Sequence, residues 1–383
     1  MTARARARIG CAWRIGVSAL TAAVALGTGG MAAASADSGR SGQADGREII
    51  TAELAARQLC TPTDPDLEEV SGLVVTGEAM YAIGDSGSDH QILVLDADCA
   101  VVGVLEVPVP TVDVEDMALG PDGRLWLADI GDNRAIRESV RLIGIDPQAP
   151  DEAIVHELVY PDRAHDAEAL LLGPDGVPII VVKKPLGPDG VYAPEEPMAV
   201  GDQPGTEPVP LAQVGTLELP VTDTPGGPIP GVHTPAVTGG AVEPGGAVVA
   251  LRTYTDLYLY RVAEGEIVAG LRGPALHLPL PERPQGEAIA LTADGAAVMA
   301  SEAASGPLPP LDEIPGAVQA ALAELPPPSA TEVEAGSGEP AEAADESNGP
   351  STGALLAIGL GFSVIAVATW AAALWKMRRD RRG

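Results

Sequence analysis

Aromatic side chains are scarce in this chain of 383 residues, which has one Phe, four Trp and six Tyr. The single Phe and two of the tryptophans fall in one apolar run near the C-terminus, so Trp126 is the only tryptophan between residues 37 and 352. The core of that part must therefore be built from Val, Leu, Ile and Ala. Stacking surfaces for bases or sugars are correspondingly few.

Positive charge is also scarce away from the chain ends. The formal net charge is −31, and Lys183 and Lys184 are the only lysines before residue 376. Nucleic acid and anionic lipid are bound through Lys and Arg, so we expect no nucleic-acid partner. The acidity could also simply keep the protein soluble at a cell surface.

Cysteine is limited to three residues, and Cys11 lies in the signal peptide predicted below. Cys60 and Cys99 remain, an even pair without a CxxC partner, which predicts a disulfide formed in an oxidising compartment. Two unpaired, buried thiols are the alternative.

Familiar catalytic signatures are absent. The sequence has no G-x-S-x-G elbow and no P-loop, and its histidines show no HxxxH or HxH spacing, which disfavours a zinc site. His165 lies three residues before Glu168, but alone it indicates a loop hydrogen bond more than a catalytic base.

The two ends predict secretion and anchoring. Residues 1–36 have the arginines, the short apolar run and the small-residue cleavage site of a signal peptide, with retention as an uncleaved anchor as the alternative. Residues 353–375 are uncharged and long enough to cross a bilayer of about 30 Å, and the basic tail 376–383 should stay cytoplasmic. We expect a single-pass protein of the cell membrane whose residues 37–352 are extracellular.

The extracellular part divides by composition. Residues 37–48 are rich in Ser, Gly and charge and are predicted to be disordered, whereas residues 49–303 carry the β-type runs of a folded domain. Residues 304–352 are rich in Pro, Ala, Glu and Ser and are predicted to form a disordered stalk, interrupted by one short helix at 315–325.

One pattern recurs within the folded domain: a glutamate, a small or apolar run, and a tight turn seven residues after the glutamate. It starts at Glu69, Glu115, Glu168 and Glu287, and a fifth copy starts at Thr238. Repeats of this length with four short strands each predict an all-β chain folded as a β-propeller. We expect five blades, or six if the long third repeat contains another.

The last repeat has only two strands, 288–291 and 296–300. We expect N-terminal strands at 48–51 and 55–59 to complete it and close the ring, which would remove exposed strand edges. The disulfide would then join the terminal strand to the first blade.

The glutamates indicate where chemistry could occur. A hairpin folds back on itself, so residues at equal distances from its turn lie side by side, here at the channel mouth away from the turns. The predicted metal ligands at this mouth are Glu69, Glu115, Glu168, Glu287, Asp129, Asp132 and Asn133, with Asp85, Asp113 and Asp166 close by. The predicted anion- or substrate-binding residues are Arg252, Lys183 and Lys184.

Three interpretations of this acidic ring stay open. Each glutamate could bond backbone N–H groups of the neighbouring blade, the ring could bind Ca²⁺ or another divalent cation, or the carboxylates could be catalytic. The three basic residues offer a further way to balance the charge, as direct ion pairs.

Six sequence blocks carry a family resemblance. They cover residues 69–73, 113–118, 128–133, 165–170, 250–256 and 284–289. The chain resembles an uncharacterised family of secreted actinobacterial β-propellers, and two of the blocks are similar to those of the "esterase-like activity of phytase" and gluconolactonase-type propellers. The resemblance implies a propeller fold and no settled activity.

Two functions follow from these observations. The first is a cell-surface binding or scaffold propeller, anchored in the membrane, for an extracellular protein or small-molecule ligand. The alternative is a divalent-metal-dependent hydrolase of phosphoesters or lactones, with the carboxylates holding the metal. The sequence leaves open whether the protein is an enzyme.

Overall fold

The computed structural model describes residues 41–44, 47–85, 87–184, 187–205, 207–229, 231–263 and 265–328. The predicted signal peptide, the apolar segment 353–375, the basic tail and the stalk beyond residue 328 lie outside these residues. Within the described part of the chain, no helix combines the length and the apolar character needed to cross a membrane.

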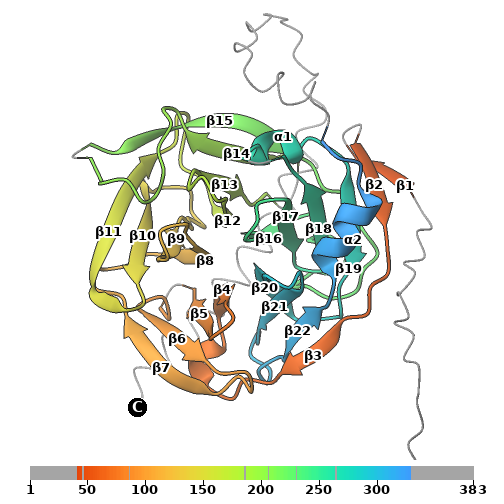
Figure 1. Ribbon diagram of the computed structural model, residues 1–383, viewed down its shortest axis with the longest axis horizontal. Coiled ribbons are helices and arrows are strands. Elements are labelled where there is room, and N and C mark those ends of the chain that lie inside the picture. Colours follow the sequence, from red (N-terminus) through yellow and green to blue (C-terminus); the bar gives the residue numbers. More distant parts are fainter. Residues whose placement is uncertain are drawn as a thin grey trace, which may run out of the picture. The chain divides into compact units, whose positions relative to one another are not determined.

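Strands dominate the described residues, and they form sheets of four, eight, six and four strands around a common centre (Figure 1). The first four-stranded sheet is a simple antiparallel meander in chain order, preceded by the 3-10 turn η1 (Pro65–Leu67). Its strands are β4 (Val70–Val75), β5 (Met80–Gly84), β6 (Gln91–Leu95) and β7 (Val101–Glu106).

The eight-stranded sheet consists of two such antiparallel groups joined at their outer strands. The parallel pairing of β11 with β15, Leu158 opposite Val209, makes the join. The first group is β8 (Val114–Leu119), β9 (Leu125–Asp129), β10 (Val140–Asp146) and β11 (Ala149–Val159). The second is β12 (Ala167–Leu172), β13 (Pro178–Val182), β14 (Asp189–Pro194) and β15 (Val209–Leu217).

The six-stranded sheet combines one antiparallel group with two N-terminal strands. The group is β16 (Val237–Val242), β17 (Val248–Thr253), β18 (Asp256–Arg261) and β19 (Ala275–Pro279), with the short helix α1 (Ile267–Gly270) before β19. A single strand is predicted over 267–278, so this outer strand is shorter than expected. The N-terminal strands β1 (Ser41–Ala44) and β2 (Arg47–Thr51) add to its edge, with β2 parallel to β19.

The last sheet closes the fold with both ends of the folded part. It contains β20 (Gln285–Leu291), β21 (Ala297–Glu302), β22 (Leu311–Ile314) and the N-terminal strand β3 (Arg57–Cys60). The expectation that residues 55–59 complete this repeat is thus confirmed for β3. The segment 48–51 instead extends the neighbouring sheet as part of β2.

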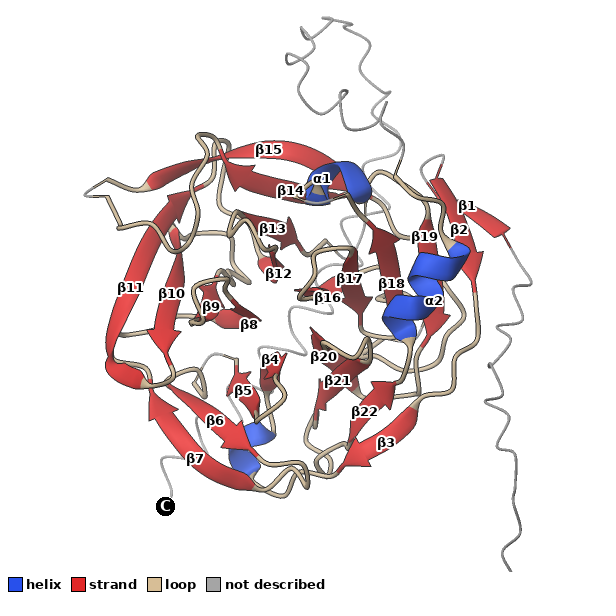
Figure 2. Ribbon diagram, in the orientation of Figure 1, coloured by secondary structure: helices blue, strands red, loops and turns tan. Residues whose placement is uncertain are grey.

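The fold continues beyond residue 303, where the stalk is predicted to begin. Strand β22 pairs with β21, and helix α2 (Ala317–Glu324), close to the helix predicted at 315–325, packs against β17 and β18 (Figure 2). Ala317, Val318 and Ala321 of α2 are buried in one hydrophobic cluster with β17 and β18. Apolar residues spaced along one helix face thus override a Pro- and Ala-rich composition.

The innermost strands β4, β8, β12, β16 and β20 contact one another in chain order, and β20 contacts β4 (Figure 1). Mostly aliphatic side chains fill the space between neighbouring sheets, as the scarcity of aromatics predicts. The few aromatic residues there include Trp126, Tyr192, Tyr258 and Tyr260, which are fully buried. Antiparallel groups set radially around a shared centre are the β-propeller architecture.

The predicted disulfide is confirmed. Cys60 at the end of β3 bonds to Cys99 in the turn between β6 and β7, with 5.7 Å between their Cα atoms. The bond joins the strand that completes the last sheet to the first sheet, and so fastens the closure of the ring.

Loss of this disulfide should therefore destabilise the fold. The loop spans 39 residues of sequence separation, and the chain-entropy relation gives about 4 kcal/mol for a loop of that length. We expect the Cys60→Ser, Cys99→Ser double variant to melt well below the wild type, and dithiothreitol to lower the Tm of the wild type only. Equal melting of both proteins would contradict a structural role.

Candidate functional site at the channel mouth

Each innermost strand carries a β-bulge near its start, where one extra residue interrupts the register with the second strand. The bulges fall at Ser71, Glu115, Glu168, Thr238 and at the pair beginning with Glu287. Bulges redirect side chains and are frequent beside functional sites. We call these five positions the bulge ring.

The first strand differs from expectation, because Ser71 and not Glu69 occupies its bulge. In four of the five hairpins, the N–H group that closes the turn belongs to the residue five positions after the bulge: Thr76, Gly120, Glu243 and Thr292. In the first sheet this hairpin closes from Thr76 N to Ala79 O, whereas the second closes from Gly120 N to Arg124 O. Because of this tighter turn, Gly77 lies two positions closer to its bulge than the other turn glycines do. A pattern aligned on the turn glycine therefore selects Glu69, two residues before Ser71.

The two hydroxyl members of the bulge ring bond the neighbouring strand. Ser71 Oγ donates to the carbonyl oxygen of Glu115 at 2.5 Å, and Thr238 Oγ1 donates to that of Gly286 at 2.7 Å. Both side chains are buried. Hydroxyls at these positions thus hold adjacent innermost strands together by donating to backbone carbonyls, which differs from the expected pattern of glutamates that accept from backbone N–H groups.

Lys183, which follows β13, balances the acidic members on one side of the mouth. Its Nζ donates to Glu168 Oε1 at 2.5 Å and lies 5.4 Å from the centre of the Tyr254 ring. Burial opposes the charge of this ammonium, but the carboxylates of Glu168 and Glu287 raise its pKa well above the usual value. Glu287 is 5% exposed, and its Oε2 has no hydrogen-bond partner among the described residues.

Next to this ion pair, several carboxyl groups lie close to one another. One oxygen each of Asp85, Asp113 and Glu115 lie within 4.8 Å of one another, and the same holds for Glu115, Asp166 and Glu168. We call these sets the two carboxylate trios, with Glu115 shared between them. A Cβ at Gly131 would lie 2.2 Å from Glu115 Oε1 and 2.7 Å from Asp113 Oδ2. These carboxyl groups therefore occupy the space that a larger side chain at position 131 would need.

Burial makes these carboxyl groups hard to ionise. It raises the pKa of Asp113 to about 7, with a further contribution from the hydrogen bond to Asp85. Burial raises the pKa of Glu168 to about 8 although Lys183 opposes the shift, and it raises that of Glu115 well above the usual value, with Glu168 and Asp85 adding to the effect. Glu302 at the end of β21 has a pKa of about 7 for the same reason, increased by Asp85 and Glu69. Carboxyl groups at the mouth are therefore partly protonated near neutral pH.

The predicted ligands Asp129, Asp132 and Asn133 lie beside the trios with partners of their own. Asp129 is fully buried and forms ion pairs with Arg137 Nη1 at 2.9 Å and with Arg141. Asp132 Oδ2 accepts from two backbone N–H groups of its own loop, and Asn133 is exposed. The carboxylates of Asp129 and Asp132 thus already have partners in this loop and in β10.

Arg252 and Lys184 are likewise engaged within the fold. Arg252 is 2% exposed, and its Nη1 donates to the carbonyls of Ala288 and Ala300, each at 2.6 Å. Burial lowers the pKa of Arg252 to about 10. The backbone N–H of Lys184 donates to Asp189 Oδ1. The Lys184 ammonium acts electrostatically on Asp189, and Lys183 is the one of the three predicted basic residues whose charged group hydrogen-bonds to a glutamate of the ring.

Asp116, next to Glu115, is a residue that the repeat pattern did not single out. It is fully buried, and its carboxylate accepts from the N–H groups of Met117, Leu170 and Gly240, on β8, β12 and β16. A charged residue inside the otherwise apolar run of an innermost strand was the available signal.

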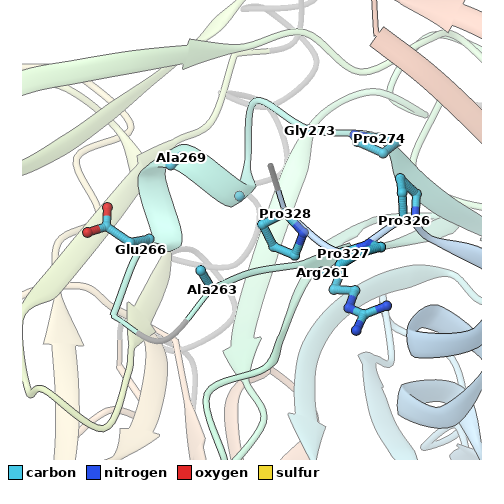
Figure 3. Close-up of a pocket in the computed structure, with 10 residues that line it drawn as sticks. Arg261, Ala263, Glu266, Ala269, Gly273, Pro274, Pro326, Pro327 and Pro328 are labelled. Atoms are coloured by element: carbon cyan, nitrogen blue, oxygen red, sulfur yellow. The ribbon is translucent and has the colours of Figure 1, made fainter. Parts of the chain in front are cut away.

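Two cavities lie elsewhere. One of about 260 Å³ is lined by apolar parts of the innermost strands and the turns after them, including Leu73, Met117 and Ile289, and so lies at the channel end opposite the mouth. Another, of about 180 Å³, lies between α1 and Pro326, Pro327 and Pro328, where the described chain ends (Figure 3). Neither contains the carboxylate trios.

Comparisons with known proteins give the chain no family. No family model matches it, and no curated protein matches it. Among solved structures, it is similar to a gluconolactonase from Xanthomonas campestris, at 12% identity over 64% of this chain and 71% of the other, with a TM-score of 0.37. It is also similar to the WD40 repeats of RRP9, at 13% identity over 68% of this chain and 97% of the other, with a TM-score of 0.36.

The raised carboxyl pKa values predict an unusual pH dependence of stability. An acid whose pKa is higher in the folded state binds its proton more tightly there, so its contribution to stability is complete at low pH and lost as pH rises through the folded value. For Asp113 and Glu168 that window extends from about pH 4 to about pH 8. We expect the Tm to fall between pH 5 and pH 8, and less steeply in Asp113→Asn. A Tm that rises across this window would contradict the prediction.

Proposed function

We propose that the chain is a cell-surface propeller of five blades, built on β4, β8, β12, β16 and β20, that binds an extracellular ligand at its acidic mouth. Residues 353–375 anchor it in the cell membrane as a single span, residues 37–352 are extracellular, and the basic tail 376–383 is cytoplasmic. It acts as a binding or scaffold module for a small molecule or protein.

The observation that carries this proposal is the gathering of buried carboxyl groups at one end of the channel. Two carboxylate trios share Glu115, and among the described residues Lys183 is the cation that hydrogen-bonds to them. Burying unbalanced charge is costly, and natural folds retain it where a ligand completes the site. A cationic ligand, with Ca²⁺ or another divalent ion as the simplest example, matches this charge.

Position 136 provides a direct test. Ile136 is 62% exposed on the loop between β9 and β10, on the mouth side, whereas Glu152 is exposed on the outer strand β11. The full chain, with a photoreactive amino acid at either position, is expressed on intact cells and irradiated. We expect a discrete adduct from position 136 and none from 152, and added protease should digest the domain without opening the cells. Equal labelling from both positions, or a protected domain, would argue against the proposal.

A second candidate is a divalent-metal-dependent hydrolase of phosphoesters or lactones. The pKa values of about 7 for Asp113 and about 8 for Glu168 favour it, because general acids and bases work best near the ambient pH. The trios would hold the metal, which would polarise the substrate, and Lys183 would face the substrate anion. Turnover of such substrates that is lost in both Asp113→Asn and Glu168→Gln would establish this function instead.

A further inference from the structure

Lys183 has two buried carboxylates beside it but hydrogen-bonds to one of them. Its Nζ donates to Glu168 Oε1, while Glu287 attracts the same ammonium and keeps Oε2 without a donor. A buried acceptor left without a partner costs about 1–3 kcal/mol. Glu287 therefore offers a second acceptor for an ammonium that is already close to it.

Glu168 also belongs to a carboxylate trio with Glu115 and Asp166. Ca²⁺ takes six to eight oxygen ligands at about 2.3–2.6 Å, so oxygens that share one ion lie within about 5 Å of each other. The spacing of 4.8 Å or less within each trio meets this condition. An ion held by the trio of Glu115, Asp166 and Glu168 would take Glu168 as a ligand, and Lys183 is hydrogen-bonded to that same group.

We propose that the trio of Glu115, Asp166 and Glu168 binds a divalent cation of the Ca²⁺ type, and that Lys183 moves from Glu168 to Glu287 when the cation binds. This inference rests on the proposed binding function of the mouth and adds the ligand and its control. Lys183 is then a competitor built into the chain, because its ammonium and the cation require the same carboxylate and repel each other.

The surroundings of Lys183 suit both positions. The Tyr254 ring lies 5.4 Å from Nζ, and the electrostatic influence of Glu287 reaches the Tyr254 hydroxyl as well as Lys183. An aromatic face that attracts the ammonium lowers the cost of leaving Glu168. The neighbouring acid Asp129 is ion-paired with Arg137 and Arg141, so it does not compete with Glu168 and Glu287 for the Lys183 ammonium.

A double-mutant cycle separates the competitor from the ligands. Ca²⁺ is titrated calorimetrically into the full chain in detergent, as wild type, Lys183→Met, Glu287→Gln and the double variant. Removing the ammonium should tighten Ca²⁺ binding about tenfold, a coupling typical of linked sites. Glu287→Gln should weaken binding several-fold when Lys183 is present and leave it unchanged in the Lys183→Met background.

Two further variants complete the experiment. Glu115→Gln should abolish binding, since Glu115 belongs to both trios, and Glu152→Gln on the outer strand should bind as the wild type does. Melting curves of every variant verify folding, and Lys183→Gln replaces Lys183→Met should the latter not fold.

Three results would overturn the inference. Equal Ca²⁺ affinity with and without the ammonium would remove the competition, and equal weakening by Glu287→Gln in both backgrounds would make Glu287 a ligand itself. No binding of Ca²⁺, Mg²⁺ or Mn²⁺ by the wild type or Lys183→Met would remove the cation site. In that last case an adduct from position 136 would still support the binding function, so the two proposals fail separately.

Discussion

Replacing Arg252 by Met is expected to destabilise the protein by about 3–5 kcal/mol, because two buried carbonyl oxygens lose their donor at about 1–3 kcal/mol each and the packing of the long side chain changes. Arg252 on β17 is 2% exposed and donates from Nη1 to the carbonyls of Ala288 and Ala300, on the neighbouring strands β20 and β21. Without the guanidinium both carbonyls lose a donor, and the contact between the sheets loses its only charged link at this point among the described residues.

The stability of Arg252→Lys should lie between that of the wild type and that of Arg252→Met, since an ammonium lacks the planar geometry that serves both carbonyls at once. Arg124→Met is the matched control: its pair with Asp122 is partly exposed, at 32% and 17%, and such pairs contribute about 0–1 kcal/mol. The measurement is urea unfolding of the full chain in detergent. A stability loss for Arg252→Met no larger than for Arg124→Met would contradict the structural role.

The Arg252 result also bears on which cation faces the mouth. The sequence marks Arg252 by its distance from a turn, and the register of β17 agrees with that placement. The repeat pattern does not reveal that the adjacent sheet buries Arg252, because that burial depends on contacts across 36 and 48 residues of chain. Lys183 lies one position further from its turn, just beyond the end of β13, and its ammonium reaches Glu168. Burial by the adjacent sheet thus decides which of these basic residues faces the mouth.

The same reasoning explains what the repeat predicted well. A glutamate at a fixed distance from an Asp-Gly turn recurs because these innermost strands have a bulge at that point, so Glu115, Glu168 and Glu287 could be placed together from sequence. Ser71 could not, because the first hairpin is tighter and its serine lacks the charge that drew attention to the others. Strand β22 was missed for another reason: its pairing with β3 joins segments about 250 residues apart, within a stretch whose composition favours disorder.

Asp116 links three innermost strands, and Asp116→Ala should be as damaging as the loss of Arg252. Its Oδ1 accepts from Met117 N at 2.8 Å, and its Oδ2 from Leu170 N at 2.9 Å and Gly240 N at 3.2 Å. Alanine leaves these buried N–H groups without an acceptor, at about 1–3 kcal/mol each, so we expect a total of about 3–5 kcal/mol once partial relaxation is included.

Asp116→Asn distinguishes the hydrogen bonds from the charge. Its amide oxygen can replace one carboxylate oxygen, but its NH₂ group must face a backbone N–H, so we expect a loss of about 1–3 kcal/mol. Burial raises the pKa of Asp116 well above the usual value, against the three N–H groups that lower it. Asp175→Ala, at an exposed turn where the carboxylate accepts from Val177 N, is the control and should change stability by less than about 0.5 kcal/mol. If Asp116→Ala unfolds at the same urea concentration as Asp175→Ala, the prediction is contradicted. The innermost strands would then be held together by side-chain packing alone, and the hairpins would determine the geometry of the bulge ring.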